Sequence, residues 1–222
     1  MAKSEKTVRV REHPRVVPIS KKNPRGITIV DEHPRRVPGT YLDVFETISI
    51  FRKRTTQNFV RPTAAKLPDY KKSDTYDEPI GFWVNYFNEK LSPGNSLDPD
   101  VIKALIASES SFMAHNPKNK KATGITQITR QTWKIVQDPK GEAKDFTFSK
   151  VRLKDLKDPR IAIPIGVRWI YHKKKLAAGK LGREPSHEEI ILEYKGLLKS
   201  NTEYKNRALS SYRDAYAKLK SK

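Results

Sequence analysis

The sequence contains no cysteine among its 222 residues, so it can form neither a disulfide framework nor a thiolate metal site. Its five histidines show no metal-binding spacing such as His-Glu-x-x-His, and we expect no catalytic metal and no other cofactor. No apolar run approaches the roughly eighteen residues that a membrane-spanning helix needs. These absences direct the search for function to polar side chains held by a packed fold.

A carboxylate interrupts the apolar face of a predicted helix over residues 98–112. Asp98 and Pro99 have the pattern of an N-cap followed by proline at the first helical position. Steps of three, four and three then place four residues on one side of the helix: Ile102, Leu105, Glu109 and Phe112. A carboxylate facing an apolar wall holds its proton more tightly than one in water, as a general acid requires. The alternative is a glutamate at a helix end that turns to solvent.

Three further segments follow this helix end in the chain. Residues 122–129 have the sequence Ala-Thr-Gly-Ile-Thr-Gln-Ile-Thr and precede a predicted helix over 130–136. Asp-Pro at 158–159 is followed by Gly-Val-Arg-Trp-Ile-Tyr at 166–171. Glu-Tyr-Lys-Gly occupies residues 193–196. Each segment alone is a weak signal, whereas the four together, in this order, form a specific pattern.

In this order the segments resemble the lytic transglycosylases of the soluble-transglycosylase (SLT) type, whose domain is related to goose-type lysozyme. The resemblance covers about residues 78–220. It implies a mainly α, lysozyme-like transglycosylase domain, which we place at residues 74–222, with Glu109 as the catalytic residue. It also implies that the glycan is bound by Ser110, Gly124, Ile125, Thr126, Gln127 and Tyr194.

Three positions depart from the family pattern. Ala162 stands where an asparagine is common, which removes one polar side chain. Pro164 lies where a helix interior is expected, and proline there removes a backbone hydrogen bond, so we expect the helix to start near Ile163 or to kink. Lys195 replaces the asparagine that usually follows the tyrosine, here Tyr194, and this puts one substrate-facing polar group in doubt.

The chemistry has to work with one carboxylate. Most glycoside hydrolases use two, but Glu142 and Asp145 lie in a Lys-rich loop and Glu193 is only adjacent to Tyr194. The resemblance implies that the substrate's N-acetyl oxygen attacks the anomeric carbon while Glu109 protonates the leaving oxygen. Glu109 would then take the proton of the 6-hydroxyl, so that the MurNAc-GlcNAc β-1,4 bond is cleaved and 1,6-anhydro-MurNAc ends are formed.

The supporting residues each have a structural alternative. A capping box over 186–189 starts a helix that turns Tyr194 inward. By resemblance its hydroxyl meets Glu109 or the substrate N-acetyl group; otherwise it is a core tyrosine bonded to a carbonyl. Gln127 either binds sugar or caps a neighbouring loop. Gly124 either lets the backbone approach the sugar closely or take a positive φ, or is a plain turn glycine.

Residues 1–73 form a different kind of sequence, a basic N-terminal arm with a linker. Glu-His-Pro-Arg at 12–15 returns at 32–35, and short alternating runs precede each copy. So many prolines and so few apolar residues cannot build a core, and we expect two short β-strands or an extended arm. Residues 41–52 are more apolar and could be a helix or strand packing on the catalytic domain, while residues 53–77 have the composition of a linker.

The formal net charge is +20 and is spread over both halves of the chain. Such a field concentrates a protein on polyanions and makes its binding salt-sensitive. Besides peptidoglycan glycan strands we therefore expect anionic cell-surface polymers as partners of the basic arm, with nucleic acid as an alternative although no nucleic-acid motif is present. We expect a monomer.

The first residues, Met-Ala-Lys-Ser-Glu-Lys-Thr, have no apolar core and do not match a signal peptide. Because murein lies outside the cytoplasm, we expect the protein to act on the bacterial cell wall, in the periplasm or outside the cell, after lysis, virion delivery or specialised secretion. A phage endolysin or virion-associated lysin fits these expectations best.

Two classes of function stay open. The first is a peptidoglycan-cleaving enzyme, either a lytic transglycosylase or a hydrolytic muramidase of the same fold. The second is a non-catalytic basic protein that binds the cell wall or nucleic acid. Glu109 on an apolar face, together with Gln127 and Tyr194, favours the enzyme.

Overall fold

The computed structural model describes residues 7–10, 13–16, 27–30, 33–36, 41–54, 58–64, 70, 72–92, 95–114 and 121–221. The contacts divide the chain into two compact units, residues 1–41 and residues 42–222. The described part of the second unit is mainly α, as the sequence predicts. The expected domain boundary between residues 73 and 74 stays a prediction about where the catalytic part begins.

The described residues of the N-terminal unit form two antiparallel strand pairs that include parts of both copies of the sequence repeat. It contains four short strands: β1 (Thr7–Val10), β2 (His13–Val16), β3 (Ile27–Val30) and β4 (His33–Arg36). β1 pairs with β4 and β2 pairs with β3. Thr7 lies opposite Arg36 and Val16 lies opposite Ile27, so both ladders keep one register. In each pair a His-Pro-Arg strand lies antiparallel to the alternating run that precedes the other copy of the repeat: β4 pairs with β1, and β2 pairs with β3.

The strand pairs include segments that the sequence did not predict as strands. The alternating runs form strands, as expected, but the His-Pro-Arg segments are strands too. Proline lacks the N–H that a central strand would need. A two-stranded ladder gives each strand one outer edge, where Pro14 and Pro34 are tolerated. The Glu12 and Glu32 that begin the repeated motif lie outside the described residues.

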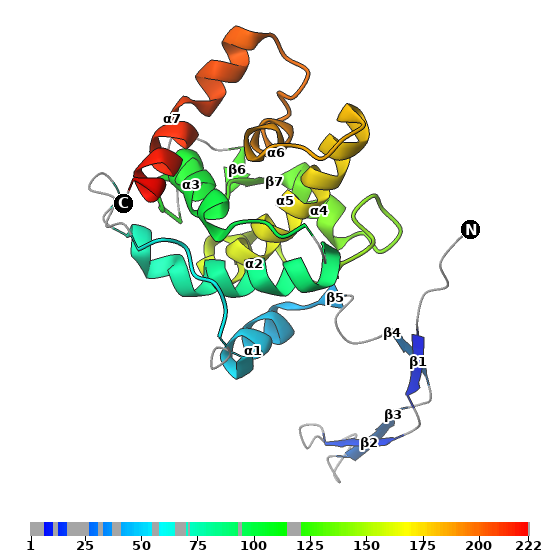
Figure 1. Cartoon of the computed structure of the whole chain (residues 1–222). Coiled ribbons are helices and arrows are strands. Elements are labelled where there is room, and N and C mark those ends of the chain that lie inside the picture. Colours follow the sequence, from blue (N-terminus) through cyan, green and yellow to red (C-terminus); the bar gives the residue numbers. More distant parts are fainter. Residues whose placement is uncertain are drawn as a thin grey trace. The chain divides into compact units, whose positions relative to one another are not determined.

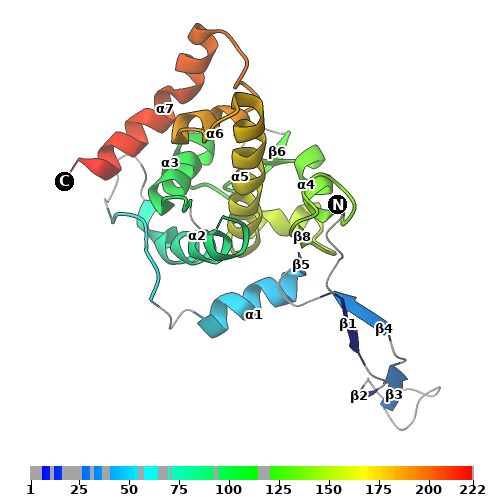
Figure 2. The ribbon, with the colours of Figure 1, turned by 45° about the vertical axis from the view of Figure 1, so that its right-hand side comes forward.

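The second unit is a helical body, and its described residues include two short strand pairings between the helices (Figures 1 and 2). Its elements are β5 (Tyr41–Leu42), α1 (Val44–Arg54), η1 (Ser73–Tyr76), α2 (Asp77–Leu91), α3 (Pro99–Ser110), β6 (Ala122–Thr123), β7 (Ile128–Thr129), α4 (Arg130–Gln137), β8 (Thr147–Phe148), η2 (Leu153–Lys157), α5 (Pro159–Leu181), α6 (His187–Tyr194) and α7 (Thr202–Lys220). β5 pairs with β8 and β6 pairs with β7.

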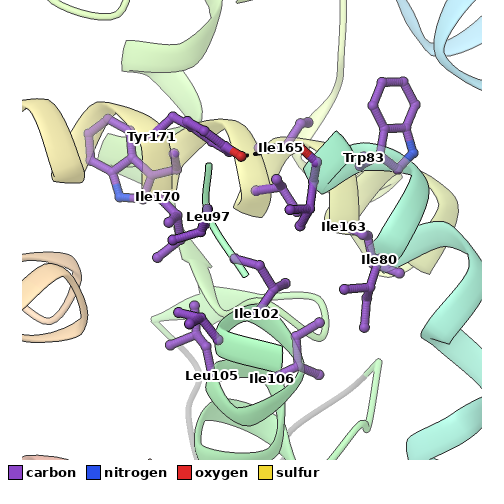
Figure 3. Close-up of a cluster of buried hydrophobic side chains, with 14 of the residues drawn as sticks. Ile80, Trp83, Leu97, Ile102, Leu105, Ile106, Ile163, Ile165, Ile170 and Tyr171 are labelled. Carbon is purple, nitrogen blue, oxygen red and sulfur yellow. Dashed lines mark hydrogen bonds between the residues drawn. The ribbon is translucent and has the colours of Figure 1, made fainter. Parts of the chain in front are cut away.

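The core lies where α2, α3 and α5 meet. Figure 3 shows Ile102 and Ile106 of α3 turned towards the same cluster as Ile80 of α2 and Ile163 of α5. α3 also packs against α7, and α5 against α1 and α6. Residues 99–107 of α3 are buried on every side. The helix that carries Glu109 is therefore the internal helix of the domain, and its end is held from several directions.

Two helix starts follow the sequence signals closely. The Asp98 carboxylate accepts a 2.9 Å hydrogen bond from the backbone N–H of Asp100, with Pro99 at the first helical position. In the capping box that opens α6, Ser186 accepts from the Glu189 backbone N–H and Glu189 accepts from the Ser186 backbone N–H. Both helices begin at the residues that the caps predict.

Of the two outcomes expected from Pro164, a start of α5 near Ile163 is wrong, and a kink stays a prediction. The helix begins at Pro159, capped by the Asp158 carboxylate, and Pro164 lies inside it. The cap and the first-position proline already fix the start of the helix. Pro164 then removes only one backbone hydrogen bond, which would have run to the residue one turn back, and the packing of α5 compensates for it.

Residues 42–77 pack on the helical body over much of their length. Phe51 of α1 contacts Phe82 of α2, with ring centroids 5.3 Å apart. This confirms the expectation that residues 41–52 pack as a helix or strand. The segment predicted as a linker is also attached: the backbone N–H of Thr63 donates a 2.6 Å hydrogen bond to the Asp100 carboxylate of α3.

A buried lysine ties this segment to α3. The Lys103 side chain is fully buried, and its ammonium donates to the Thr63 carbonyl at 2.9 Å. It also contacts Asp74 at 2.6 Å and Asp77 at 2.8 Å. Burial raises the pKa of Asp77 to about 6 although Lys103 acts in the opposite direction. Three segments of the chain thus meet at one buried cation.

Candidate active site

Glu109 lies in the last turn of α3, one residue before the helix ends at Ser110. Its side chain is 16% exposed, so one edge of the carboxylate reaches the surface. The Lys195 ammonium donates a hydrogen bond to Oε1 of Glu109. Lys195 is the C-cap residue of α6 and is itself only 18% exposed. The carboxylate is therefore held in a partly buried ion pair, and its placement against an apolar wall stays a prediction.

The end of α3 is fixed by the next three residues. The Ser110 hydroxyl donates to the Ile125 carbonyl at 2.7 Å. Ser111 and Phe112 follow with φ angles of 52° and 60°, which turn the chain away from the helix axis. The Phe112 ring is buried and lies 5.8 Å from the Tyr70 ring, centroid to centroid. The Glu-Ser-x-Phe motif is thus a helix end that is anchored by the two motif residues following the acid.

Gly124 has a conformation and a position that require glycine. Its φ is +76°, and a Cβ placed there would lie 2.2 Å from the Leu156 carbonyl oxygen. Of the explanations weighed from the sequence, the positive φ applies, and the close approach in the structure is to the protein's own backbone. The near neighbour is η2 of the protein itself. Contact between Gly124 and a sugar stays a prediction.

Thr126 and Ile125 face the interior. The Thr126 hydroxyl donates to the Ala162 carbonyl at 3.0 Å, and Ile125 is fully buried. Gly166 makes room for Thr126, because a Cβ at Gly166 would lie 2.5 Å from the Thr126 methyl carbon. The loop is thereby locked onto α5 through the backbone of Ala162, at the position where the family commonly has an asparagine.

Gln127 closes the loop on itself. Its side-chain nitrogen donates to the Gly124 carbonyl at 2.8 Å, and its backbone N–H donates to the same carbonyl at 3.0 Å. The residue is 6% exposed and has a φ of 50°. This is the loop-capping role that the sequence left open beside sugar binding, and binding of sugar by Gln127 stays a prediction.

Tyr194 links α6 to the same loop. Its hydroxyl donates to the Thr126 carbonyl. Burial raises the pKa of the Tyr194 phenol well above its ordinary value, and the negative charge of Glu109 contributes in the same direction. Of the partners considered from the sequence, the structure gives a backbone carbonyl as the acceptor. Tyr194 lies close enough to Glu109 to sense its charge and keeps its proton.

The other candidate carboxylates have partners on α5. Glu193 is buried and contacts the Lys180 ammonium at 2.6 Å, while Asp145 contacts Lys175 at 2.8 Å. Glu142 lies 3.5 Å from the His172 ring nitrogen. In the described ranges no cluster of three or more histidine or acidic side chains could hold a metal ion. The three carboxylates thus contact side chains of α5, whereas the cation that contacts Glu109 is Lys195 at the end of α6.

The sequence did not identify Lys195 as the partner of Glu109. Its signal was the departure from asparagine after Tyr194, which indicated a changed polar group but not where its charge would go. The buried Lys103 gave no signal, since a lysine in a helix normally reaches solvent. All six predicted glycan-binding residues belong to one network of hydrogen bonds around the 124–127 loop: Ser110, Gly124, Ile125, Thr126, Gln127 and Tyr194.

Comparison with known proteins gives one match that covers more than half of the chain. Residues 86–213 match the model of the transglycosylase SLT domain, and this range contains Glu109, the 124–127 loop and Lys195. Among curated proteins none matches the chain. No helix in the described ranges is both long and apolar enough to cross a membrane. The chain therefore belongs to the transglycosylase SLT domain family, and its function is of the lytic-transglycosylase type, the degradation of cell-wall peptidoglycan.

Proposed function

We propose that the protein cleaves the MurNAc-GlcNAc β-1,4 bond of peptidoglycan and leaves 1,6-anhydro-MurNAc ends, with Glu109 as the only catalytic carboxylate. The observation that carries the proposal is the placement of Glu109 at a fixed helix end, partly exposed, beside Tyr194 and Lys195. A catalytic group must be held rigidly and must be accessible to the substrate. The fixed helix end supports the first requirement, and the partial exposure of Glu109 supports the second.

In the proposed reaction Glu109 acts first as an acid. The N-acetyl oxygen of MurNAc attacks the anomeric carbon, the bond to the GlcNAc oxygen breaks, and the proton of Glu109 goes to that leaving oxygen. The 6-hydroxyl oxygen of MurNAc then attacks the anomeric carbon, and the bond between this carbon and the N-acetyl oxygen breaks. The Glu109 carboxylate takes the hydroxyl proton, which restores its starting form.

The predicted glycan-binding residues have two kinds of role in this proposal. Ser110, Ile125 and Thr126 are buried and bonded within the protein, so they would act by shaping the loop beside the acid. The backbone near Gly124, the Gln127 carboxamide and the rim of Tyr194 would meet the glycan. The other candidate carboxylates, Glu142, Asp145 and Glu193, contact side chains of α5, which favours assistance by the substrate over a two-carboxylate mechanism.

The test is mass spectrometry of peptidoglycan digested by the purified protein. The expected products are muropeptides with anhydro-muramic ends, which are lighter by one water than reducing muramic ends. Reducing ends would assign the protein to the hydrolytic muramidases of the same fold. Binding without release of any fragment would support the non-catalytic alternative. Delivery as a phage endolysin or virion-associated lysin, and polyanion binding by the basic arm, stay predictions.

A further inference from the structure

Lys195 places a positive charge beside the proposed acid, Glu109. The asparagine that is usual at this position would place a neutral amide there. Its ammonium contacts Glu109, and both side chains are more than four-fifths buried. A partly buried charge is tolerated when a counter-charge lies beside it. While Glu109 is ionised, the pair of Glu109 and Lys195 is neutral and requires no counter-charge from the substrate.

The charge balance changes when Glu109 acts as the acid. Within the proposed function, on which this inference rests, Glu109 must carry a proton when the glycan binds. Lys195 then loses the counter-charge that it has in the structure. A partly buried ammonium without a counter-ion is unfavourable, and an anionic group on the bound glycan would restore neutrality.

We propose that Lys195 is a specificity-determining residue that selects MurNAc units with a free lactyl carboxylate, that is, glycan from which the stem peptide has been removed. The lactyl group stands on the same sugar ring as the anomeric carbon that Glu109 serves. When a peptide is attached, its carboxyl is a neutral amide. When the peptide is absent, it is an anion within reach of a lysine on its flexible four-carbon stem.

In this proposal Lys195 exchanges one partner for another between the free enzyme and the complex with the glycan. In the free enzyme the ammonium binds the Glu109 carboxylate. On binding of a peptide-free glycan it moves to the lactyl carboxylate, which leaves Glu109 free to hold its proton. As the proton passes to the leaving oxygen, the new Glu109 carboxylate again has the ammonium nearby. Charge-assisted hydrogen bonds of this kind are stronger than those of an amide at the same position.

The experiment compares two soluble tetrasaccharides of alternating GlcNAc and MurNAc that differ only in the lactyl group. One carries the free carboxylate and the other its methyl amide, which imitates the bond to a stem peptide. We expect the wild-type kcat/KM to be at least about tenfold higher for the carboxylate. Lys195→Asn should bring the two values within about twofold of each other, and Lys195→Arg should keep the preference.

Lys199→Asn is the matched control, because it removes one positive charge from an exposed position four residues away in the chain. Its preference should equal that of the wild type, which separates a local contact from the general attraction of a basic protein for an anion. Equal kcat/KM values for the two substrates with the wild-type protein would overturn the inference while leaving the proposed function intact. If the protein cleaves neither tetrasaccharide and does not cleave peptidoglycan, both the proposed function and the inference are wrong.

Discussion

The hydroxyl of Ser110 donates a 2.7 Å hydrogen bond to the carbonyl of Ile125, which joins the residue after the candidate acid to the middle of the 124–127 loop. Tyr194 binds the next carbonyl of that loop, at Thr126. The end of α3, the loop and the end of α6 are therefore fixed to one another around Glu109. Variants of Glu109 and of the surrounding residues can therefore separate the chemistry of Glu109 from the contacts that hold it in place.

Glu109→Gln should lower turnover of peptidoglycan by at least about a hundredfold, because glutamine keeps the size of the side chain but cannot transfer a proton. The measurement is the rate of muropeptide release at saturating substrate, with circular dichroism to establish that the variant is folded. Glu142→Gln is the control, since its carboxylate lies near His172 on α5. Near wild-type lysis by folded Glu109→Gln would dismiss Glu109 as the acid.

Gly124→Ala should destabilise the domain by about 3 kcal/mol or more, since it combines an unfavourable positive φ with overlap onto the Leu156 carbonyl. Gly182→Ala provides the matched comparison. Gly182 also has a positive φ, of +68°, but nothing lies within 4 Å of its added Cβ, so the cost should be about 1 kcal/mol. Urea unfolding of both variants measures the difference, and equal losses would show that the approach to Leu156 carries no weight.

Lys103→Met should destabilise the protein by about 3–5 kcal/mol, because it leaves Asp74 and Asp77 near the interior without their cation. Lys220→Met is the comparison: Lys220 also contacts two aspartates, but it is 45% exposed and Asp100 keeps its hydrogen bonds from Thr63, so we expect a smaller loss than in Lys103→Met.

The loss in Lys103→Met should also depend on pH. Burial raises the pKa of Asp77 to about 6, so its carboxyl is largely neutral at pH 5 and ionised at pH 8. A neutral carboxyl needs no counter-charge, and the destabilisation relative to the wild type should therefore grow as pH rises through 6. Unfolding by urea at pH 5 and pH 8 tests this. A loss that is larger at pH 5 would contradict the assignment.

Removal of residues 1–40 should leave cleavage of small soluble muropeptides nearly unchanged, because the compact helical unit begins at Leu42. Activity on whole cell walls should fall, and its salt dependence should become shallower, because fewer cations then meet the polyanionic surface. Both activities are measured over a range of salt concentrations. Loss of soluble-substrate cleavage by a folded truncated protein would mean that the arm belongs to the active site.

A longer truncation, of residues 1–70, serves as the contrast. It removes α1 with its Phe51 contact and the Thr63 groups that bind Asp100 and Lys103. This protein should be clearly less stable than the shorter truncation in thermal unfolding. Equal stability of the two proteins would show that the segment predicted as a linker contributes nothing.

The sequence by itself determined the features that depend on neighbours along the chain. The caps at Asp98 and Ser186 join residues two or three positions apart, so spacing alone predicts them. The order of the four motifs was enough to indicate the family and a mainly α fold. Pro164 misled the prediction of α5 because a local rule was applied where the Asp158 cap and the packing of the helix decided the outcome.

Only the tertiary structure decided which groups surround the acid. Lys195 and Glu109 are 86 residues apart, and Tyr194 and Thr126 are 68 residues apart. Contacts at such separations depend on how α3, α6 and the loop pack, and periodicity within one element carries no information about its neighbour. The same holds for Lys103, whose burial follows from the segments that fold over α3. The sequence placed a carboxylate at a helix end, and the packing gave it a lysine.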